Sequence, residues 1–116
     1  MPYDLIDKII EKQRADREAK RIKTLSEMKE ILADLSLKYD FSKAYIFGSL
    51  VKKGRFGSES DADIAVFDLD NEYFFSMMAE ISRLLGRNVD LYQIENINEH
   101  LRKRIEETGM LWMQEG

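Results

Sequence analysis

Two acidic residues, spaced two apart, stand at the start of an apolar segment near the middle of the chain. Asp61 and Asp63 flank Ala62, and the apolar run Ile64-Ala65-Val66 follows. In a β-strand successive side chains alternate between the two faces, so both carboxylates would project from the same face. Two carboxylates this close repel one another unless a cation lies between them. The spacing therefore favours a divalent-metal site with oxygen ligands.

A third carboxylate, Asp90, lies between apolar residues in a later segment. An aspartate inside an apolar strand is costly unless it is paired or bound to a metal. If this strand lies beside that of Asp61 and Asp63, three carboxylates converge, as two divalent ions require to grip a triphosphate and align an attacking oxygen. Ordinary surface acids are the alternative, because a second Asp-x-Asp at residues 68–70 is typical of a simple turn.

A glycine-serine pair, Gly48-Ser49, follows a short apolar segment upstream of these acids. A glycine lets the backbone approach a ligand closely, and a serine adds a hydroxyl donor beside main-chain N–H groups. The loop that follows carries Lys53 and Arg55 together with two glycines. Such a loop can hold phosphate groups, and a solvated basic hairpin loop is the alternative.

The composition limits which metals and which chemistry such a site can use. The chain has 116 residues, with 18 Lys and Arg, 22 Asp and Glu, a single His and no Cys. This inventory excludes disulfides, thiolate zinc sites, a cysteine nucleophile and multi-histidine metal sites. A metal must be held mainly by oxygen atoms, which favours magnesium or manganese.

The same numbers bound the organisation and the partners of the protein. The length fits one domain and leaves little room for two. The net charge of −4 argues against nonspecific binding to duplex DNA. No stretch approaches the roughly 20 apolar residues that cross a bilayer, and no signal peptide is recognisable. We therefore expect a cytoplasmic protein without a membrane partner and without specific nucleic-acid binding.

The elements that must position these residues follow from hydrophobic periodicity, which predicts an α+β fold with a small mixed sheet covered by helices. Glycines and an asparagine at the predicted helix ends support the boundaries. The predicted helices span residues 4–38, 72–85 and 98–108, and the predicted strands span residues 44–47, 62–67, 89–92 and 110–113.

Residues 1–38 are predicted to be an N-terminal helical extension of a domain formed by residues 39–116. They form either one long helix or two helices with a break near residues 23–26. A continuous helix would be roughly 50 Å long, which is more than a small domain can cover. Its first half would then project, with a patch of Leu5, Ile6, Ile9 and Ile10 open to a partner. A helix folded back onto its own domain is the alternative.

The order of these motifs resembles the minimal nucleotidyltransferases, small members of the DNA-polymerase-β-like nucleotidyltransferase superfamily. The resemblance rests on Tyr45-Ile46-Phe47-Gly48-Ser49, the basic glycine loop, Ser60-Asp61-Ala62-Asp63-Ile64-Ala65-Val66 and the later Asp90. It covers about residues 30–113 and implies the nucleotidyltransferase fold. The loop between Ser49 and Asp61 is one residue longer than the spacing in the family, and Ala62 replaces a branched apolar residue.

The resemblance also implies roles for individual residues. Asp61, Asp63 and Asp90 would bind two magnesium ions, or manganese in their place, and Asp90 would help to deprotonate the acceptor hydroxyl. The residues implied to contact the nucleotide are Gly48, Ser49, Lys53, Arg55 and Ser60. The reaction would move AMP from ATP to a hydroxyl group, with pyrophosphate leaving.

A transferase this small has few residues left to form a pocket for the acceptor. We therefore expect the acceptor to come from another chain. Transferases of this type are often encoded beside HEPN-domain partners, where the transferase is the antitoxin and can adenylylate a tyrosine of the HEPN toxin. One alternative is an antitoxin that neutralises its partner by contact alone. Another is a small-molecule, antibiotic-modifying nucleotidyltransferase, although those generally carry an additional helical domain. A homodimer stays open.

Overall fold

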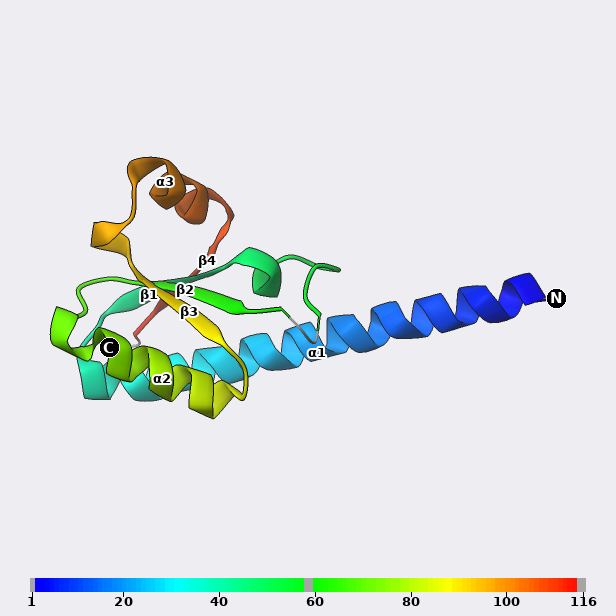
Figure 1. Cartoon of the computed structure of the whole chain (residues 1–116), viewed down its shortest axis with the longest axis horizontal. Coiled ribbons are helices and arrows are strands. Elements are labelled where there is room, and N and C mark those ends of the chain that lie inside the picture. Colours follow the sequence, from blue (N-terminus) through cyan, green and yellow to red (C-terminus); the bar gives the residue numbers. More distant parts are fainter. Residues whose placement is uncertain (1, 58–59, 115–116) are drawn as a thin grey trace.

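The computed structural model describes residues 2–57 and 60–114 and confirms the α+β class (Figure 1). Short 3₁₀ turns connect several of the main elements. The turns are η1 (Gly48–Val51), η2 (Asn71–Tyr73) and η3 (Ile94–Asn96). The main elements are α1 (Pro2–Tyr39), β1 (Lys43–Phe47), β2 (Ala62–Val66), α2 (Phe74–Leu85), β3 (Val89–Gln93), α3 (Glu99–Thr108) and β4 (Met110–Met113).

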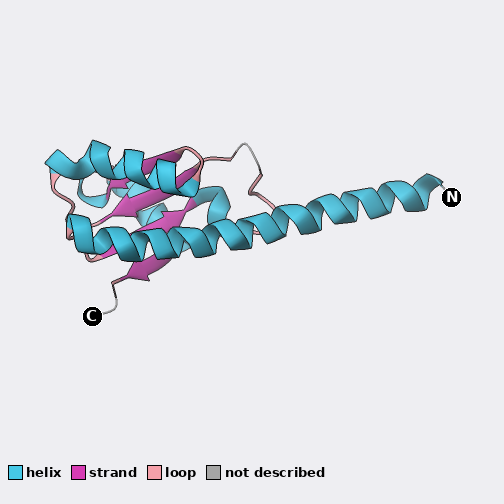
Figure 2. Cartoon of the chain, turned by 90° about the horizontal axis from the view of Figure 1, so that it is seen from below, coloured by secondary structure: helices cyan, strands magenta, loops and turns pink. Residues whose placement is uncertain are grey.

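The four strands form one mixed sheet in the order β3-β2-β1-β4. Strand β1 is antiparallel to both β2 and β4, whereas β2 and β3 are parallel. Helices α1 and α2 cover one face of this sheet, and α3 lies on the other (Figures 1 and 2). The sheet therefore has one fully covered face and one face that α3 covers only in part.

The main core lies between the sheet and the α1–α2 layer. Ile46 and Ile64 point into it from neighbouring strands, and they meet Met28 and Leu32 of α1 and Ile81 of α2. All five side chains are fully buried. Burial of each such side chain contributes roughly 1.5–3 kcal/mol. Because alternate strand residues face this core, the residues between them are free to build the opposite face.

Helix α1 runs without a break for 38 residues, so the predicted alternative of two helices is wrong. Thr24 lies in the stretch where a break was considered, and its side chain is buried against the domain. Arg21 also anchors the helix, because its Nη1 donates a hydrogen bond of 3.2 Å to the carbonyl oxygen of Leu50. Packing on the domain thus keeps a polar stretch helical.

The first half of α1 projects from the domain, as expected for a continuous helix (Figure 2). Leu5 and Ile10 remain 63% and 40% exposed, and the molecule measures 59 × 30 × 25 Å. The folded-back alternative is therefore wrong. Within the described ranges, no helix combines the length and the apolar character needed to cross a membrane.

The other predicted boundaries hold to within one or two residues. Gly86 ends α2 in the left-handed conformation with φ 75°. Asn98 caps α3, because its Oδ1 accepts a hydrogen bond of 2.8 Å from the backbone N–H of Leu101. The helix predicted at 72–85 begins at Phe74, since a 3₁₀ turn occupies the preceding residues.

Candidate active site

The strand register brings the predicted acidic residues together on the partly covered face of the sheet. Asp63 on β2 lies opposite Asp90 on β3, and Phe47 at the end of β1 lies opposite Asp63 on the other side. Asp61 precedes β2 by one residue. The condition set from the sequence, that the strand of Asp90 lies beside that of Asp61 and Asp63, is therefore met.

Asp61, Asp63 and Asp90 together form what we call the acidic row. Its negative charge is uncompensated. Partial burial, followed by the charges of Asp90 and Asp61, raises the pKa of Asp63 from 3.8 to about 6. Burial and then the charges of Asp63 and Asp90 also raise the pKa of Tyr92. Asp61 and Asp90 are exposed, so a cation can reach them from solvent. A bound divalent cation would relieve this repulsion.

Gly48 stands directly against the carboxylate of Asp63. A Cβ at this position would lie 2.5 Å from Asp63 Oδ2, and the glycine has φ +78°. Both the close approach and the left-handed backbone require glycine. Ser49 follows in turn η1, where its carbonyl oxygen accepts a hydrogen bond of 3.2 Å from the N–H of Lys52. The turn thus places backbone rather than a side chain beside Asp63.

These residues fit a hard divalent cation. The donor set is entirely oxygen, two carboxylates are paired across adjacent strands, and the cradle at Gly48 keeps the site free of a side chain. Among the residues that the structure describes, no group of three His, Cys, Asp or Glu side chains already stands in a metal-binding arrangement. Mutual repulsion of the carboxylates opposes such a convergence until a cation joins them.

Part of the basic loop lies beside α1. Lys53 and Arg55 are exposed. A hydrogen bond from Arg21 lowers the pKa of Glu18 in α1, and the nearby charge of Lys53 lowers it slightly further. The charges that shift the pKa of Asp63 are all acidic. The structure therefore places Lys53 near Glu18 of α1.

Ser60 takes part in the turn that leads to Asp61. Its Oγ accepts a hydrogen bond of 2.9 Å from the N–H of Gly57, and its own N–H donates to the Gly57 carbonyl oxygen over 3.2 Å. This arrangement fixes the side chain beside the start of β2. The Ser60 hydroxyl can still donate a hydrogen bond.

The sequence analysis missed two residues near the site. Phe47 packs on Tyr92 with their ring centroids 5.6 Å apart, so the aromatic pair adjoins the carboxylates. Tyr92 is half-buried, and this contact places it beside the site. It stands two residues after Asp90, so the alternation of a strand puts both side chains on one face. Arg87 Nη1 donates to the carbonyl oxygen of Ser60 over 2.8 Å. The role of Arg87 has no sequence signal, because it depends on which segments the fold brings together.

Helix α3 covers only one part of this face. Its Ile105 is buried with Ala65 of β2, and half-buried aromatic residues pack around them. The small Ala65, two residues along the strand from Asp63 on the same face, leaves room for the helix. Helix α3 therefore covers the part of the face around Ala65 and leaves the acidic residues open to solvent.

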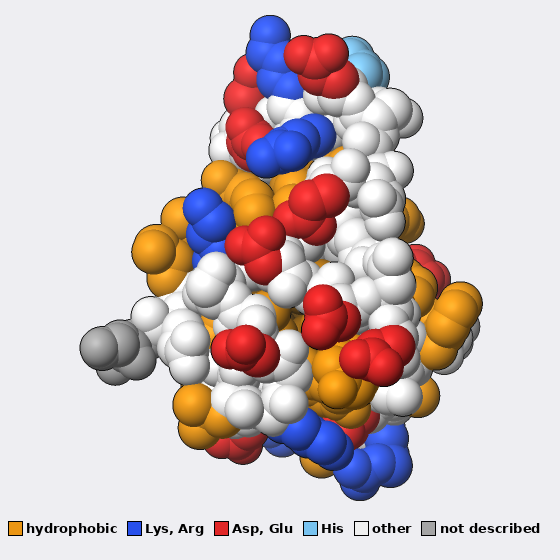
Figure 3. Space-filling model, turned by 90° about the vertical axis from the view of Figure 1, so that its left-hand side faces the viewer, with side chains coloured by type: hydrophobic (Ala, Val, Ile, Leu, Met, Phe, Trp, Pro, Cys, Tyr) orange, Lys and Arg blue, Asp and Glu red, His pale blue; other side chains and the backbone are white. Residues whose placement is uncertain are grey.

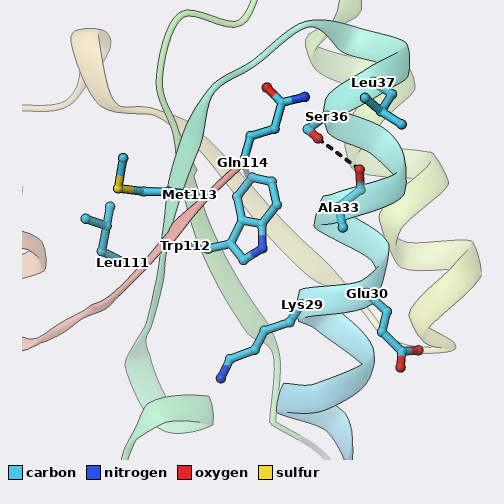
Figure 4. A pocket seen from close by; sticks show the side chains of 9 residues that line it. All are labelled: Lys29, Glu30, Ala33, Ser36, Leu37, Leu111, Trp112, Met113 and Gln114. Carbon is cyan, nitrogen blue, oxygen red and sulfur yellow. Dashed lines mark hydrogen bonds between the residues drawn. The ribbon is translucent and has the colours of Figure 1, made fainter. Parts of the chain in front are cut away.

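Two cavities bear on the location of the site. A groove of about 540 Å³ beside Asp61 is lined by Ser60, Asp61, Ser82, Arg83, Gly86, Arg87 and Asn88. A larger cavity of about 600 Å³ lies between α1 and β4, where the Trp112 ring borders it and the Ser36 hydroxyl donates to the Ala33 carbonyl oxygen over 2.9 Å (Figure 4). The first touches the acidic residues only at Asp61, and neither cavity is lined by Asp63, Asp90 or Gly48. The strand register, which pairs Asp63 with Asp90, therefore locates the candidate site.

The second Asp-x-Asp provides a contrast at the opposite end of β2. The backbone N–H of Asp68 donates to Glu95 over 3.0 Å, and Gln93 Nε2 donates to the Leu69 carbonyl oxygen over 3.1 Å. These bonds make an ordinary turn, as the sequence indicated. Acidic side chains lie on this end of the molecule as well, so acidity alone does not mark the site (Figure 3).

Comparison with known protein families places the chain in one of them. The family model described as polymerase beta, nucleotidyltransferase matches residues 27–115. The chain therefore belongs to the polymerase beta nucleotidyltransferase family. The comparison with curated proteins gives no significant match.

Several solved structures share the fold. A crystal structure of a toxin–antitoxin with AMP-PNP matches with a TM-score of 0.65 and 23% identity, over 75% of this chain and 73% of the other. A crystal structure of the toxin–antitoxin MntA–HepT matches with a TM-score of 0.58 and 20% identity, over 76% and 71% of the two chains. A structure described as a minimal nucleotidyltransferase matches with a TM-score of 0.63 and 20% identity, over 76% and 92%. Identities this low show a common fold.

Proposed function

We propose that this nucleotidyltransferase moves AMP from ATP to a hydroxyl group of a partner protein. The observation that carries the proposal is the pairing of Asp63 with Asp90 across adjacent strands, with Asp61 nearby and Gly48 against the Asp63 carboxylate. Phosphoryl transfer needs charge neutralisation and alignment more than a strong nucleophile, and carboxylates that hold divalent ions supply both.

Each acidic residue has its own part in the proposed reaction. Asp61 and Asp63 would hold two magnesium or manganese ions, and Asp90 would complete the metal site. Divalent ions bound there would neutralise charge on the phosphate oxygens and orient the nucleotide. Asp90 is exposed and also lies where it can accept the proton of an incoming hydroxyl group.

The nucleotide would lie along the backbone at the end of β1. Gly48 would let the phosphates approach Asp63 closely, with Ser49 and Ser60 as hydroxyl donors. Lys53 and Arg55 of the basic loop would contact the triphosphate. The acceptor oxygen would bond to the α-phosphorus, the bond from this phosphorus to the bridging oxygen would break, and pyrophosphate would leave.

The proposed acceptor is a tyrosine of a HEPN-domain toxin, for which this chain would be the antitoxin. The support is the resemblance stated from the sequence and the shared fold with antitoxins crystallised in toxin–antitoxin pairs. The projecting part of α1 offers a docking surface, because Leu5, Ile6 and Ile9 are all about half-exposed or more. Ile6 precedes the buried Thr24 by five helical turns, so the patch continues the side that packs on the domain.

That surface also favours a second candidate function, neutralisation of the partner by contact alone. The two candidates differ in their need for the acidic row. The test compares the D61N/D63N variant with D68N/D70N, which removes the same charge from the turn at the other end of β2. If the protein acts by AMP transfer, only D61N/D63N should lose ATP-dependent pyrophosphate release and toxin neutralisation, and it should still bind the partner. Full neutralisation by D61N/D63N would instead support contact alone.

A further inference from the structure

Arg87 joins two segments that the sequence keeps far apart. It lies between Gly86, which ends α2, and the start of β3. Its Nη1 donates a hydrogen bond of 2.8 Å to the carbonyl oxygen of Ser60 and one of 3.3 Å to that of Gly57. Its guanidinium carbon lies 4.2 Å from the centroid of the Phe56 ring. One side chain thus contacts three residues of the loop before β2.

The two joined segments each deliver a carboxylate to the acidic row. Ser60 directly precedes Asp61, and Arg87 stands three residues before Asp90. Beside this contact, the N–H of Ala62 donates to the carbonyl oxygen of Asn88 over 3.2 Å. That bond joins the first residue of β2 to the segment before β3, and Arg87 joins Ser60, two residues earlier, to the same segment. The position of Asp61 relative to Asp90 therefore depends on the contacts of Arg87.

The chemistry of this contact suits arginine in particular. A planar guanidinium can stack on an aromatic ring and donate in its own plane to two carbonyl groups at once, whereas a lysine ammonium is a compact point charge. The ring of Phe56 is 1% exposed, so it is a fixed platform. The loop itself contains Gly54 and Gly57, whose backbones have much conformational freedom. The arginine supplies the order that the loop sequence lacks.

We propose that Arg87 is a positioning residue that holds the Ser60–Asp61 segment at the distance from Asp90 required for metal binding. The inference rests on the proposed function of the acidic row. Arg87 acts through the loop carbonyl groups and needs no contact with the nucleotide or the reacting atoms. Its loss raises the metal concentration needed for binding and activity, and excess metal offsets the loss.

The test compares R87A and R87K with R83A in the full chain. Arg83 lines the same groove and is exposed on α2, so R83A removes the same charge without removing the loop contacts. Three quantities are measured: manganese binding by the protein alone, amide hydrogen exchange at residues 60–62, and the manganese concentration that gives half-maximal AMP transfer. Thermal unfolding reports whether each variant is folded.

We expect R87A to weaken manganese binding about tenfold, to speed exchange at residues 60–62, and to regain most of its activity at high manganese. R87K should recover part of the manganese affinity, and R83A should match the wild type. If folded R87A binds manganese and transfers AMP like the wild type, the inference is overturned while the proposed function stands. If the wild type neither binds manganese nor transfers AMP, the proposed function fails, and the exchange measurement still tests the contact itself.

Discussion

Replacement of Asp63 with asparagine should stabilise the metal-free protein at neutral and alkaline pH. Folding raises the pKa of Asp63 from 3.8 to about 6, because the carboxylate is partly buried beside Asp90 and Asp61. The folded protein therefore holds this proton more tightly than the unfolded chain does. The stabilising contribution is complete below pH 3.8 and is lost as the pH rises through about 6. Asparagine keeps the shape of the side chain and removes this loss.

The structure sets the size of the effect. A rise from 3.8 to about 6 in the pKa of Asp63 corresponds to at most about 3 kcal/mol of unfolding free energy. The side chain is only partly buried, and solvent screening reduces this contribution to about 1 kcal/mol. For a chain of this size, that free energy corresponds to about 4 °C in the melting temperature.

The assay is thermal unfolding of the wild type and D63N in the presence of a chelator at pH 8 and pH 4. We expect D63N to melt about 4 °C higher than the wild type at pH 8, with most of this difference gone at pH 4. The matched control is D70N. The Asp70 carboxylate is exposed and makes no capping hydrogen bond to the turn that follows it, so D70N should melt like the wild type at both pH values. A D63N protein that melts at or below the wild-type temperature at pH 8 would refute the reasoning.

Three further predictions concern the metal, the glycine cradle and the projecting helix. Manganese should raise the melting temperature of the wild type at pH 8 and leave that of D63N nearly unchanged, and an equal rise in both would contradict a site at Asp63. G48A should lose more than 100-fold in the rate of AMP transfer and about 1 kcal/mol or more of unfolding free energy, since its Cβ would meet the Asp63 carboxylate. A G48A protein with the steady-state kinetics of the wild type would show that the site does not need the space at Gly48. I6D/I10D should leave the melting temperature and manganese binding intact and abolish co-purification of the partner, and an intact complex would place the docking surface elsewhere.

The acidic row could be predicted from the sequence because it depends mainly on local periodicity. The apolar residues around Asp63 and Asp90 fix which face of each strand is buried, so they also fix the face of the carboxylates. The sequence could not supply the pairing of β2 with β3, which is a long-range contact. The sequence analysis stated that pairing only as a condition, and the register of Asp63 with Asp90 meets it.

The remaining features depend on contacts between distant segments. Residues 23–26 look like a helix break because they are mostly polar, yet burial of Thr24 on the domain keeps α1 continuous. Arg87 looks like an ordinary residue after a helix-ending glycine, and only the fold shows that it reaches the Ser60 carbonyl. Lys53 lies near Glu18 of α1, although the two residues are far apart in the sequence. No local pattern carries such information.

The most direct test of transfer to a partner protein is the intact mass of the partner that co-purifies with this chain. The complex is incubated with ATP and magnesium, and the D61N/D63N complex serves as the control. Transfer predicts that the partner gains the mass of one or more AMP units with the wild type alone, and fragmentation should then locate them on a tyrosine. A partner that stays unmodified, bound equally by both versions, would contradict the proposed reaction.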